Sequence, residues 1–340
     1  MTVLPVAVRR ALLPVSLVVL AGLGLLFLVL AIVGALVAPL DRRWRLARAS
    51  LFAASYCAVE IAALVAAGAV WTKRVAQKAR GSATTADWLV INQRILRFAL
   101  DAVLSSAWRW FRFRVSLDEH SVAGPLDGRA PALVLARHGG PGDSFGLVHL
   151  LMSRYAKRVR VVAKSTLQLD PALDILLNRT GGCFLGPGGS AVQGLRELVA
   201  SLDTDEVALL FPEGGNWSPA RRIRAIQHLQ RQRRPAAAQA AELMDHVLPA
   251  RPAGVLAILD RDDDLPVLFA AHAGLDKIVT LKDVWLAIPF QHAVTVRLLT
   301  GTPPPAGDEA RLAWLRAEWA VVDEWIDAHH SRIGSPASGR

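Results

Sequence analysis

Cysteine is scarce in this sequence: its 340 residues include only Cys57 and Cys183, far apart and in apolar surroundings. A disulfide framework is therefore not indicated, and the low count is consistent with a reducing compartment. The histidines also lack the close spacing with Cys, Asp or Glu that is typical of a metal site, so we expect no metal. No internal repeat is apparent, so nothing indicates a repeat architecture.

Acidic residues are outnumbered by basic ones. The 29 Asp and Glu face 39 Lys and Arg, which gives a formal net charge of +10 and a pI of about 10.5. This balance fits nucleic acid, an anionic membrane or a phosphorylated substrate as a partner. The chain is 53% hydrophobic with a mean hydropathy of +0.33, which is too apolar for an ordinary soluble domain. We therefore predict membrane segments beside one large α/β domain.

Two long apolar runs stand near the start of the chain. Residues 11–40 exceed the roughly 20 residues that cross a bilayer core, and also exceed the apolar part of a signal peptide. Residues 51–71 form a second run with one acid, Glu60, which is either functional or near a membrane interface. We predict that residues 1–74 are N-terminal membrane-embedded helices.

Arginines crowd the linker between the two runs: Arg42, Arg43, Arg45 and Arg48. The positive-inside rule predicts that this arginine-rich linker is cytoplasmic. If both runs crossed the membrane as a hairpin, a cytoplasmic linker would place the rest of the chain outside the cytoplasm. We expect instead that one or both segments re-enter the membrane or lie in one leaflet. On this hypothesis the protein is membrane-associated, with its C-terminal domain on the cytoplasmic side.

Residues 75–130 are basic and aromatic, with Trp108, Trp110 and Phe111 set among arginines. Such mixing can stack nucleic-acid bases, but beside membrane segments it more often marks a membrane-interface surface. We predict a connector at the membrane interface here, with membrane lipids and not nucleic acid as the partner.

The stretch around which the chain is organised runs from Arg137 to Phe145 and contains His138 and Asp143. It lies between an apolar strand candidate, residues 132–136, and a helix candidate. His138 could take a proton from a hydroxyl near neutral pH, and Asp143 on its other ring nitrogen would fix its tautomer. Three glycines and a proline allow the loop to fold back. A turn histidine beside a helix-capping aspartate is the alternative interpretation.

A second motif follows another apolar strand candidate, residues 207–210, and reads Phe-Pro-Glu-Gly-Gly-Asn from Phe211. His-x-x-x-x-Asp followed by Phe-Pro-Glu-Gly, each after a strand, resembles the glycerolipid acyltransferase family, of which lysophosphatidic acid acyltransferase is the best-known member. The resemblance covers roughly residues 131–276. It implies an α/β fold with a mixed central sheet flanked by helices, preceded here by the N-terminal membrane helices. We place this domain at residues 131–330 and expect a disordered tail at 331–340.

The resemblance also implies a reaction. A fatty acyl group would move from acyl-CoA or acyl-carrier protein to the hydroxyl of a lysophospholipid, first of all 1-acyl-sn-glycerol-3-phosphate, in phospholipid biosynthesis or remodelling. His138 would deprotonate the acceptor and Asp143 would orient His138, while N–H groups of residues 139–143 could stabilise the oxyanion. No cofactor is implied beyond the acyl donor, which is a co-substrate.

The acceptor contacts depart from the family pattern. Lys164 matches the lysine of the second motif, and Glu213 and Gly214 match the third. However, Pro187 and Asn216 stand where family members carry arginines expected to hold the acceptor phosphate. The identity of the acceptor is therefore open.

Two other arginines are candidates for the phosphate contact. Residues 246–254 resemble a Leu-x-Pro-Arg-x-x-Gly segment of the branch that includes lysocardiolipin and lysophosphatidylinositol acyltransferases, which makes Arg251 the first candidate. Arg221 opens a basic amphipathic helix close to the Phe-Pro-Glu-Gly motif. Downstream we expect a last family strand ending at a structural His272, two further strands at 284–290 and 293–299, and a packing helix at 308–330.

Two competing functions remain. Residues 142–146 fit Gly-x-Ser-x-Gly, so Ser144 could be the nucleophile of a serine lipase or esterase, although that motif requires a serine directly after a strand. The chain could also be a non-catalytic membrane-binding protein on the same fold.

Overall fold

The computed structural model describes residues 4–82, 84–140, 142–185, 190–262 and 264–334. The chain forms two compact units, each built from segments that are distant in sequence. The first unit contains Met1–Arg114, Ala163–Gly186 and Val284–His292, and the second contains Val115–Val162, Pro187–Asp283 and Ala293–Arg340.

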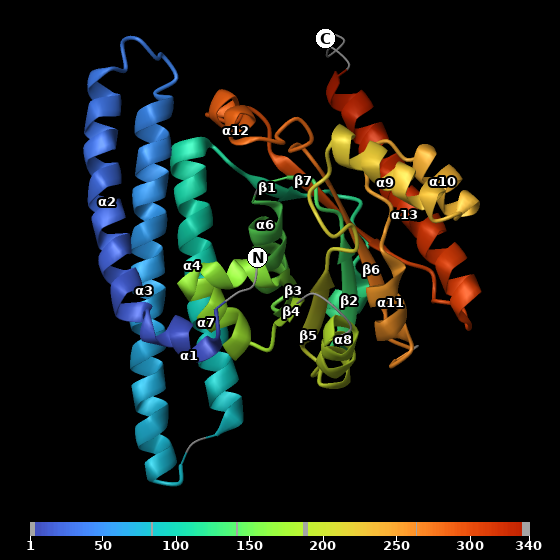
Figure 1. Cartoon of the computed structure of the whole chain (residues 1–340), viewed down its shortest axis with the longest axis horizontal. Helices are drawn as coiled ribbons and strands as arrows, with labels where there is room; N and C mark the ends of the chain where they lie inside the picture. Colours follow the sequence, from blue (N-terminus) through green and yellow to red (C-terminus); the bar gives the residue numbers. More distant parts are fainter. Residues whose placement is uncertain (1–3, 83, 141, 186–189, 263, 335–340) are drawn as a thin grey trace. The chain divides into compact units, whose positions relative to one another are not determined.

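The first unit is mainly helical. Its helices from the N-terminal segment are α1 (Val6–Ala11), α2 (Leu13–Leu36), α3 (Arg45–Ala79) and α4 (Thr85–Phe111). Figure 1 shows α2 packed along α3, and α3 packed along α4. Its other elements are the 3-10 helix η1 (Ser165–Leu169), α7 (Pro171–Arg179), β4 (Cys183–Leu185) and most of α12 (Leu281–Ala287).

α2 and α3 are long and apolar enough to cross a membrane, judged by length and composition. α2 lacks charged residues over its whole length, and several of its large side chains are exposed, among them Val18 (72%) and Leu25 (67%). Exposed apolar surfaces of this kind are typical of sites that contact a membrane or another protein.

Both ends of α2 are fastened to other segments of the first unit. Before it, Arg9 and Arg10 bond the carboxylate of Asp174 in α7, with nitrogen–oxygen distances of 3.0 and 2.6 Å. After it, Arg43 donates to the carbonyl of Leu286 at 3.3 Å. These arginines therefore bind protein acceptors as well as flanking an apolar run.

The second unit is built on a mixed sheet. Its strands are β1 (Val115–Leu117), β2 (Ala132–Ala136), β5 (Glu206–Leu210), β6 (Val267–Ala273), β7 (Val294–Thr300) and most of β3 (Arg158–Lys164), whose last two residues belong to the first unit. The strand order of the sheet is β1-β7-β6-β2-β5-β3-β4. The β6–β7 pair is antiparallel, and the pairs β1–β7, β6–β2, β2–β5 and β5–β3 are parallel. The predicted mixed α/β fold is confirmed.

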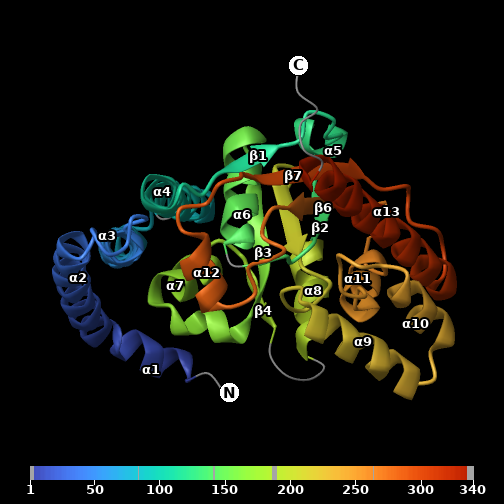
Figure 2. The same ribbon diagram turned by 90° about the horizontal axis from the view of Figure 1, so that it is seen from above.

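Helices cover both faces of this sheet. The helices of this unit are α5 (Gly124–Asp127), α6 (Asp143–Arg154), α8 (Ser190–Ala200), α9 (Pro219–Arg231), α10 (Pro235–Glu242), α11 (Pro252–Leu259) and α13 (Asp308–Gly334). In Figure 2, α6 lies on one face and α8, α11 and α13 lie on the other. β2 and β5 are buried along their whole length, as expected of parallel strands covered on both sides.

One predicted strand is wrong. Residues 284–290 were expected to form a strand, but α12 (Leu281–Ala287) occupies most of this segment. Thr280 and Asp283 form a capping box, in which the Thr280 hydroxyl accepts from Asp283 N–H at 3.2 Å and Asp283 accepts from Thr280 N–H at 2.7 Å. This local pairing starts a helix, whereas a short apolar run is compatible with either structure.

The last helix agrees with the sequence. α13 includes the predicted helix 308–330 and continues through Gly334, so it extends four residues into the tail for which disorder was expected. Residues 335–340 lie outside the described part of the chain.

The core of the second unit predicts a large stability cost for one substitution. Trp319 of α13 is fully buried, packs near Phe269 of β6 and donates from its indole to the Leu248 carbonyl at 2.9 Å. Trp319→Ala should lower the free energy of unfolding by about 3–5 kcal/mol, because it leaves a cavity and an unpaired carbonyl. Thermal unfolding measures this, with Val321→Ala on the exposed side of α13 as the control. Equal losses in both variants would contradict the core position of Trp319.

Candidate active site

The site residues gather where three adjacent parallel strands end. β2 lies between β5 and β6. If the residue pairing of β2 with β5 is continued beyond the end of β2, His138 lies opposite Glu213. If the pairing of β2 with β6 is continued in the same way, His138 lies opposite His272. Loops at the carboxyl ends of parallel strands are where α/β proteins bind ligands.

His138 and Asp143 form a direct pair. Nδ1 of His138 lies 2.8 Å from Oδ2 of Asp143, and the side chains are 22% and 2% exposed respectively. The ring of Phe211 lies beside the His138 ring, with 4.8 Å between centroids. The carboxylate is thus sealed from water, while part of the imidazole stays accessible.

Asp143 has further partners besides His138. Oδ2 also accepts from the backbone N–H of Gly139 at 2.9 Å and of Gly140 at 3.2 Å, and Nε2 of His272 lies 3.3 Å away. Burial opposes ionisation of this carboxyl, but the hydrogen bonds from His138 and His272 outweigh it and hold the pKa of Asp143 well below its ordinary value. The ionised form of Asp143 is therefore the one that its surroundings favour.

These contacts correct one expectation. The N–H groups of Gly139 and Gly140 were candidates for stabilising an oxyanion, but both donate to Asp143. They help to hold the buried carboxylate. Gly139 is also sterically required, because a Cβ there would lie 2.6 Å from both Nη1 of Arg137 and Cε1 of His272.

Arg137, immediately before His138, is a fully buried cation that fixes the loop from behind. Its Nε donates to the His246 carbonyl at 2.9 Å and its Nη1 to the His272 carbonyl at 2.7 Å, while Nη2 pairs with Asp276. The other Asp276 oxygen lies 3.0 Å from Nε2 of His330 in α13. Burial opposes the charge on Asp276, but His330 and Arg137 hold its pKa well below the ordinary range.

Glu213 joins three loops through backbone bonds. One carboxyl oxygen accepts from His138 N–H at 3.2 Å and the other from Leu248 N–H at 3.3 Å, and the side chain is buried. Both oxygens are therefore used to organise the site. Its direct contact with substrate stays a prediction.

Gly214 and Arg251 lie against each other. Gly214 has φ +69°, a left-handed conformation that favours glycine, and a Cβ there would lie 2.8 Å from Cζ of Arg251. The Arg251 N–H donates to the Pro212 carbonyl at 2.9 Å, and its side chain is exposed. The structure thus brings the Arg251 guanidinium to the Phe-Pro-Glu-Gly loop.

The two remaining predicted substrate residues lie in different surroundings. Arg221 is exposed in the first turn of α9, and its guanidinium donates to the Asn216 carbonyl at 2.9 Å. Lys164 ends β3 within the first unit and is exposed. Its role as a substrate contact stays a prediction.

Ser144 lies within α6, not directly after a strand. Its hydroxyl donates to Oδ1 of Asp143 at 3.0 Å, so its proton is directed at the carboxylate that orients His138. A nucleophilic serine would instead direct this proton at the imidazole.

Sequence reasoning missed the supporting layer of the site. We expected only a structural role for His272 and assigned none to Arg137, Asp276 or His330. The position of His272 at the end of a strand beside β2 was the available signal. Among the described residues, no group of three or more His, Cys, Asp or Glu side chains is arranged to hold a metal ion.

Glu213 makes the stability of the protein depend on pH. Burial raises its pKa from 4.5 to about 8, against the opposing effect of Arg137 and the two N–H donors. Between these values the folded chain keeps a proton that the unfolded chain has lost, so this group lowers stability as the pH rises.

The glutamine of Glu213→Gln cannot ionise, so this variant should lose the part of the pH-dependence of stability that comes from Glu213. From pH 5 to 8, the unfolding free energy of the wild type should fall relative to the variant by up to about 1.4 kcal/mol per pH unit. Thermal unfolding of both proteins across this range measures the difference. Parallel curves would show that Glu213 keeps an ordinary pKa.

Comparisons with known proteins give a family match and a similar solved structure. Residues 112–253, less than half of the chain, match the family model described as Acyltransferase, and the match includes His138 and Arg251. No curated protein matches the chain. Among solved structures, the chain is similar to the crystal structure of the 1-acyl-sn-glycerophosphate (LPA) acyltransferase, PlsC, from Thermotoga maritima. That similarity has 15% identity and a TM-score of 0.46, and covers 83% of this chain and 100% of that chain.

Proposed function

We propose that the chain is a membrane-associated O-acyltransferase of the glycerolipid acyltransferase family. It moves a fatty acyl group from acyl-CoA or acyl-carrier protein to the hydroxyl of a lysophospholipid, in phospholipid biosynthesis or remodelling. The observation that carries this proposal is the buried Asp143 carboxylate 2.8 Å from Nδ1 of the partly exposed His138. The match of residues 112–253 to the Acyltransferase family model supports the same reaction class.

The proposed chemistry starts at His138. Because Nδ1–H donates to Asp143, the lone pair of Nε2 is free to act as the base. Nε2 takes the proton of the acceptor hydroxyl while the hydroxyl oxygen attacks the thioester carbonyl carbon. A C–O bond forms, the C–S bond breaks, and the proton passes from His138 to the leaving thiolate. The proposal needs no cofactor besides the acyl donor.

The acceptor is a lipid with a phosphate group, with 1-acyl-sn-glycerol-3-phosphate as the first candidate. Arg251 supports this, because its exposed guanidinium lies against Gly214 and makes no hydrogen bond or ion pair within the described residues. Arg221 brings a second guanidinium to Asn216, the position where family members carry an arginine. An arginine pair is well suited to a phosphate because it offers several N–H donors and positive charge.

Membrane association rests on α2, whose exposed side chains are apolar. Its two ends bind Asp174 and Leu286 of the same unit, and α3 packs along α4, which carries charged residues along its length. These contacts favour a helical hairpin that lies in one leaflet and stays packed against the other helices of the first unit. A hairpin of this kind leaves the rest of the chain on the cytoplasmic side, where acyl-CoA and acyl-carrier protein are found.

The predicted base is tested by a pair of substitutions. His138→Ala should lower acyl transfer by about a hundred- to ten-thousandfold, the usual contribution of a general base. Ser144→Ala should keep most activity, because Ser144 bonds Asp143 and does not face the acceptor in this mechanism. Transfer of a labelled acyl group from acyl-CoA or acyl-carrier protein to a panel of lysolipids in detergent measures both. Loss of ester hydrolysis in Ser144→Ala would favour the lipase alternative, and unchanged transfer in His138→Ala would reject the mechanism.

The predicted phosphate contact is tested at Arg251. Arg251→Gln should raise KM for 1-acyl-sn-glycerol-3-phosphate and lower kcat/KM about tenfold to a hundredfold, since a hydrogen bond to a charged group contributes roughly 1.5–3 kcal/mol. KM for the acyl donor should stay constant. Arg261→Gln, an exposed arginine beyond α11, is the charge-matched control. An equal effect on an acceptor that lacks phosphate would contradict this role.

A further inference from the structure

Two arginines of the first unit share one aromatic ring. Arg74 of α3 and Arg179 of α7 place their guanidinium carbons 4.3 and 4.8 Å from the centroid of the Trp88 ring in α4. An indole face attracts a cation. Two cations at one ring also repel each other, so this arrangement carries a surplus of positive charge.

Within the described residues, the acceptors of the Arg179 guanidinium are neutral. Its Nη1 donates to the Ala67 carbonyl at 2.8 Å and to the amide oxygen of Asn92 at 3.4 Å. Burial, and then the charge of Arg10, lower the pKa of Arg179 to about 10, so the group is still charged at neutral pH. An anion beside it would stabilise that charge.

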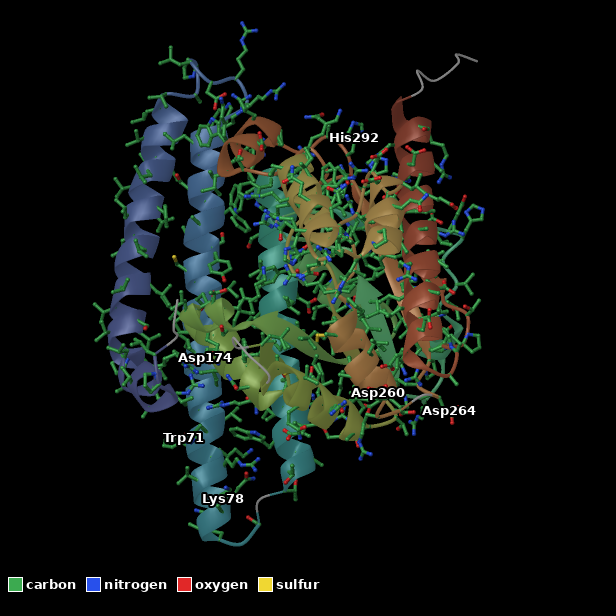
Figure 3. All side chains as sticks on the ribbon, turned by 45° about the vertical axis from the view of Figure 1, so that its right-hand side comes forward. Trp71, Lys78, Asp174, Asp260, Asp264 and His292 are labelled. Atoms are coloured by element: carbon green, nitrogen blue, oxygen red, sulfur yellow. The ribbon has the colours of Figure 1, made fainter. Side chains whose placement is uncertain are left out.

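Asp174, an acidic residue of the helix α7 that also carries Arg179, is already bonded to other side chains. The Asp174 carboxylate, labelled in Figure 3, is 1% exposed and is bonded by Arg9, Arg10 and the Asn178 amide. Within the described residues, neither Arg74 nor Arg179 forms a salt bridge with a carboxylate. The charge of these two arginines is therefore not balanced by side chains that the structure describes.

One donor of this cluster is Nη1 of Arg74. This atom is buried without a hydrogen-bond partner in the part of the chain that the structure describes. Buried polar atoms of folded proteins are normally bonded to protein, water or a ligand. A ligand with acceptor oxygens would supply the missing partner of this N–H donor.

We propose that Arg74 and Arg179, beside Trp88, bind the phosphate group of an anionic lipid headgroup. Guanidinium groups bind phosphate oxygens through paired N–H donors. Trp71 and Lys78, both labelled in Figure 3, lie one turn before and after Arg74 on α3, and Trp71 is 54% exposed. Tryptophan and lysine are the side chains that gather at the headgroup level of a membrane. All these residues belong to the first unit, whereas Arg251, the proposed acceptor contact, belongs to the second.

The experiment measures lipid binding to the full chain, purified in detergent and stripped of lipid. Three probes are titrated by native mass spectrometry or calorimetry: short-chain phosphatidylglycerol, short-chain phosphatidylcholine and inorganic phosphate. Wild type is compared with Arg74→Gln and Arg179→Gln. Arg94→Gln, an exposed arginine of α4, is the charge-matched control, and Arg251→Gln controls for binding at the proposed acceptor contact.

Phosphatidylglycerol should bind more tightly than phosphatidylcholine, and each of the first two variants should weaken it about tenfold or more. Arg94→Gln should bind it like wild type. A loss in Arg251→Gln without a loss in Arg74→Gln would assign the binding to the proposed acceptor contact and overturn the proposal. Inorganic phosphate could instead bind as tightly as phosphatidylglycerol and depend equally on Arg74 and Arg179. That result would overturn the lipid as the ligand and assign a soluble phosphate to the site.

Unchanged binding in Arg74→Gln, or an equal loss in Arg94→Gln, would overturn the proposal. If Arg179→Gln fails to fold, Arg74→Gln alone tests the proposal. The Arg74 side chain makes no hydrogen bond within the described residues, whereas the Arg179 guanidinium donates to Ala67 and Asn92.

Discussion

The negative charge buried at Asp143 is the constraint on which the proposed catalytic loop depends. An ionised carboxylate away from water is costly unless charges and hydrogen bonds surround it. Here two imidazoles, three backbone N–H groups and the Ser144 hydroxyl do so, and the loop must curl around the carboxylate to provide them. Gly139 follows from the same requirement, because the curl brings its Cα against Arg137 and His272. The orientation of His138 is thus a consequence of neutralising one charge.

A second layer of charge supports the first. Arg137 is buried directly behind His138 and is balanced by Asp276, which is in turn bonded by His330. Glu213 adds a tie between the loops that follow β2 and β5. All these residues follow the carboxyl ends of strands or lie in the helix packed against them. The sheet therefore fixes the position of His138 through its neighbours, and the imidazole itself keeps an accessible edge.

Much of this arrangement could be predicted from the sequence, for a physical reason. Central parallel strands are buried on both faces, so β2 and β5 are continuous apolar runs, and the loops that follow them are visible as motifs. The contact of His272 with Asp143 could not be predicted, because it depends on the register between strands separated by more than a hundred residues. The strand expected at 284–290 failed because a short apolar run has no period of its own, and the capping pair Thr280 and Asp283 was overlooked.

The contacts of Arg137 have a consequence for the order of events during synthesis. Its partners at His246, His272 and Asp276 are made 109, 135 and 139 residues later, and His330 follows later still. The apolar helices α2 and α3, by contrast, precede His138 in the chain. Under the proposed membrane association, these helices reach the lipid before the loop at His138 has its support. His330 lies in α13, so the support of this loop is complete only after α13 has been synthesised.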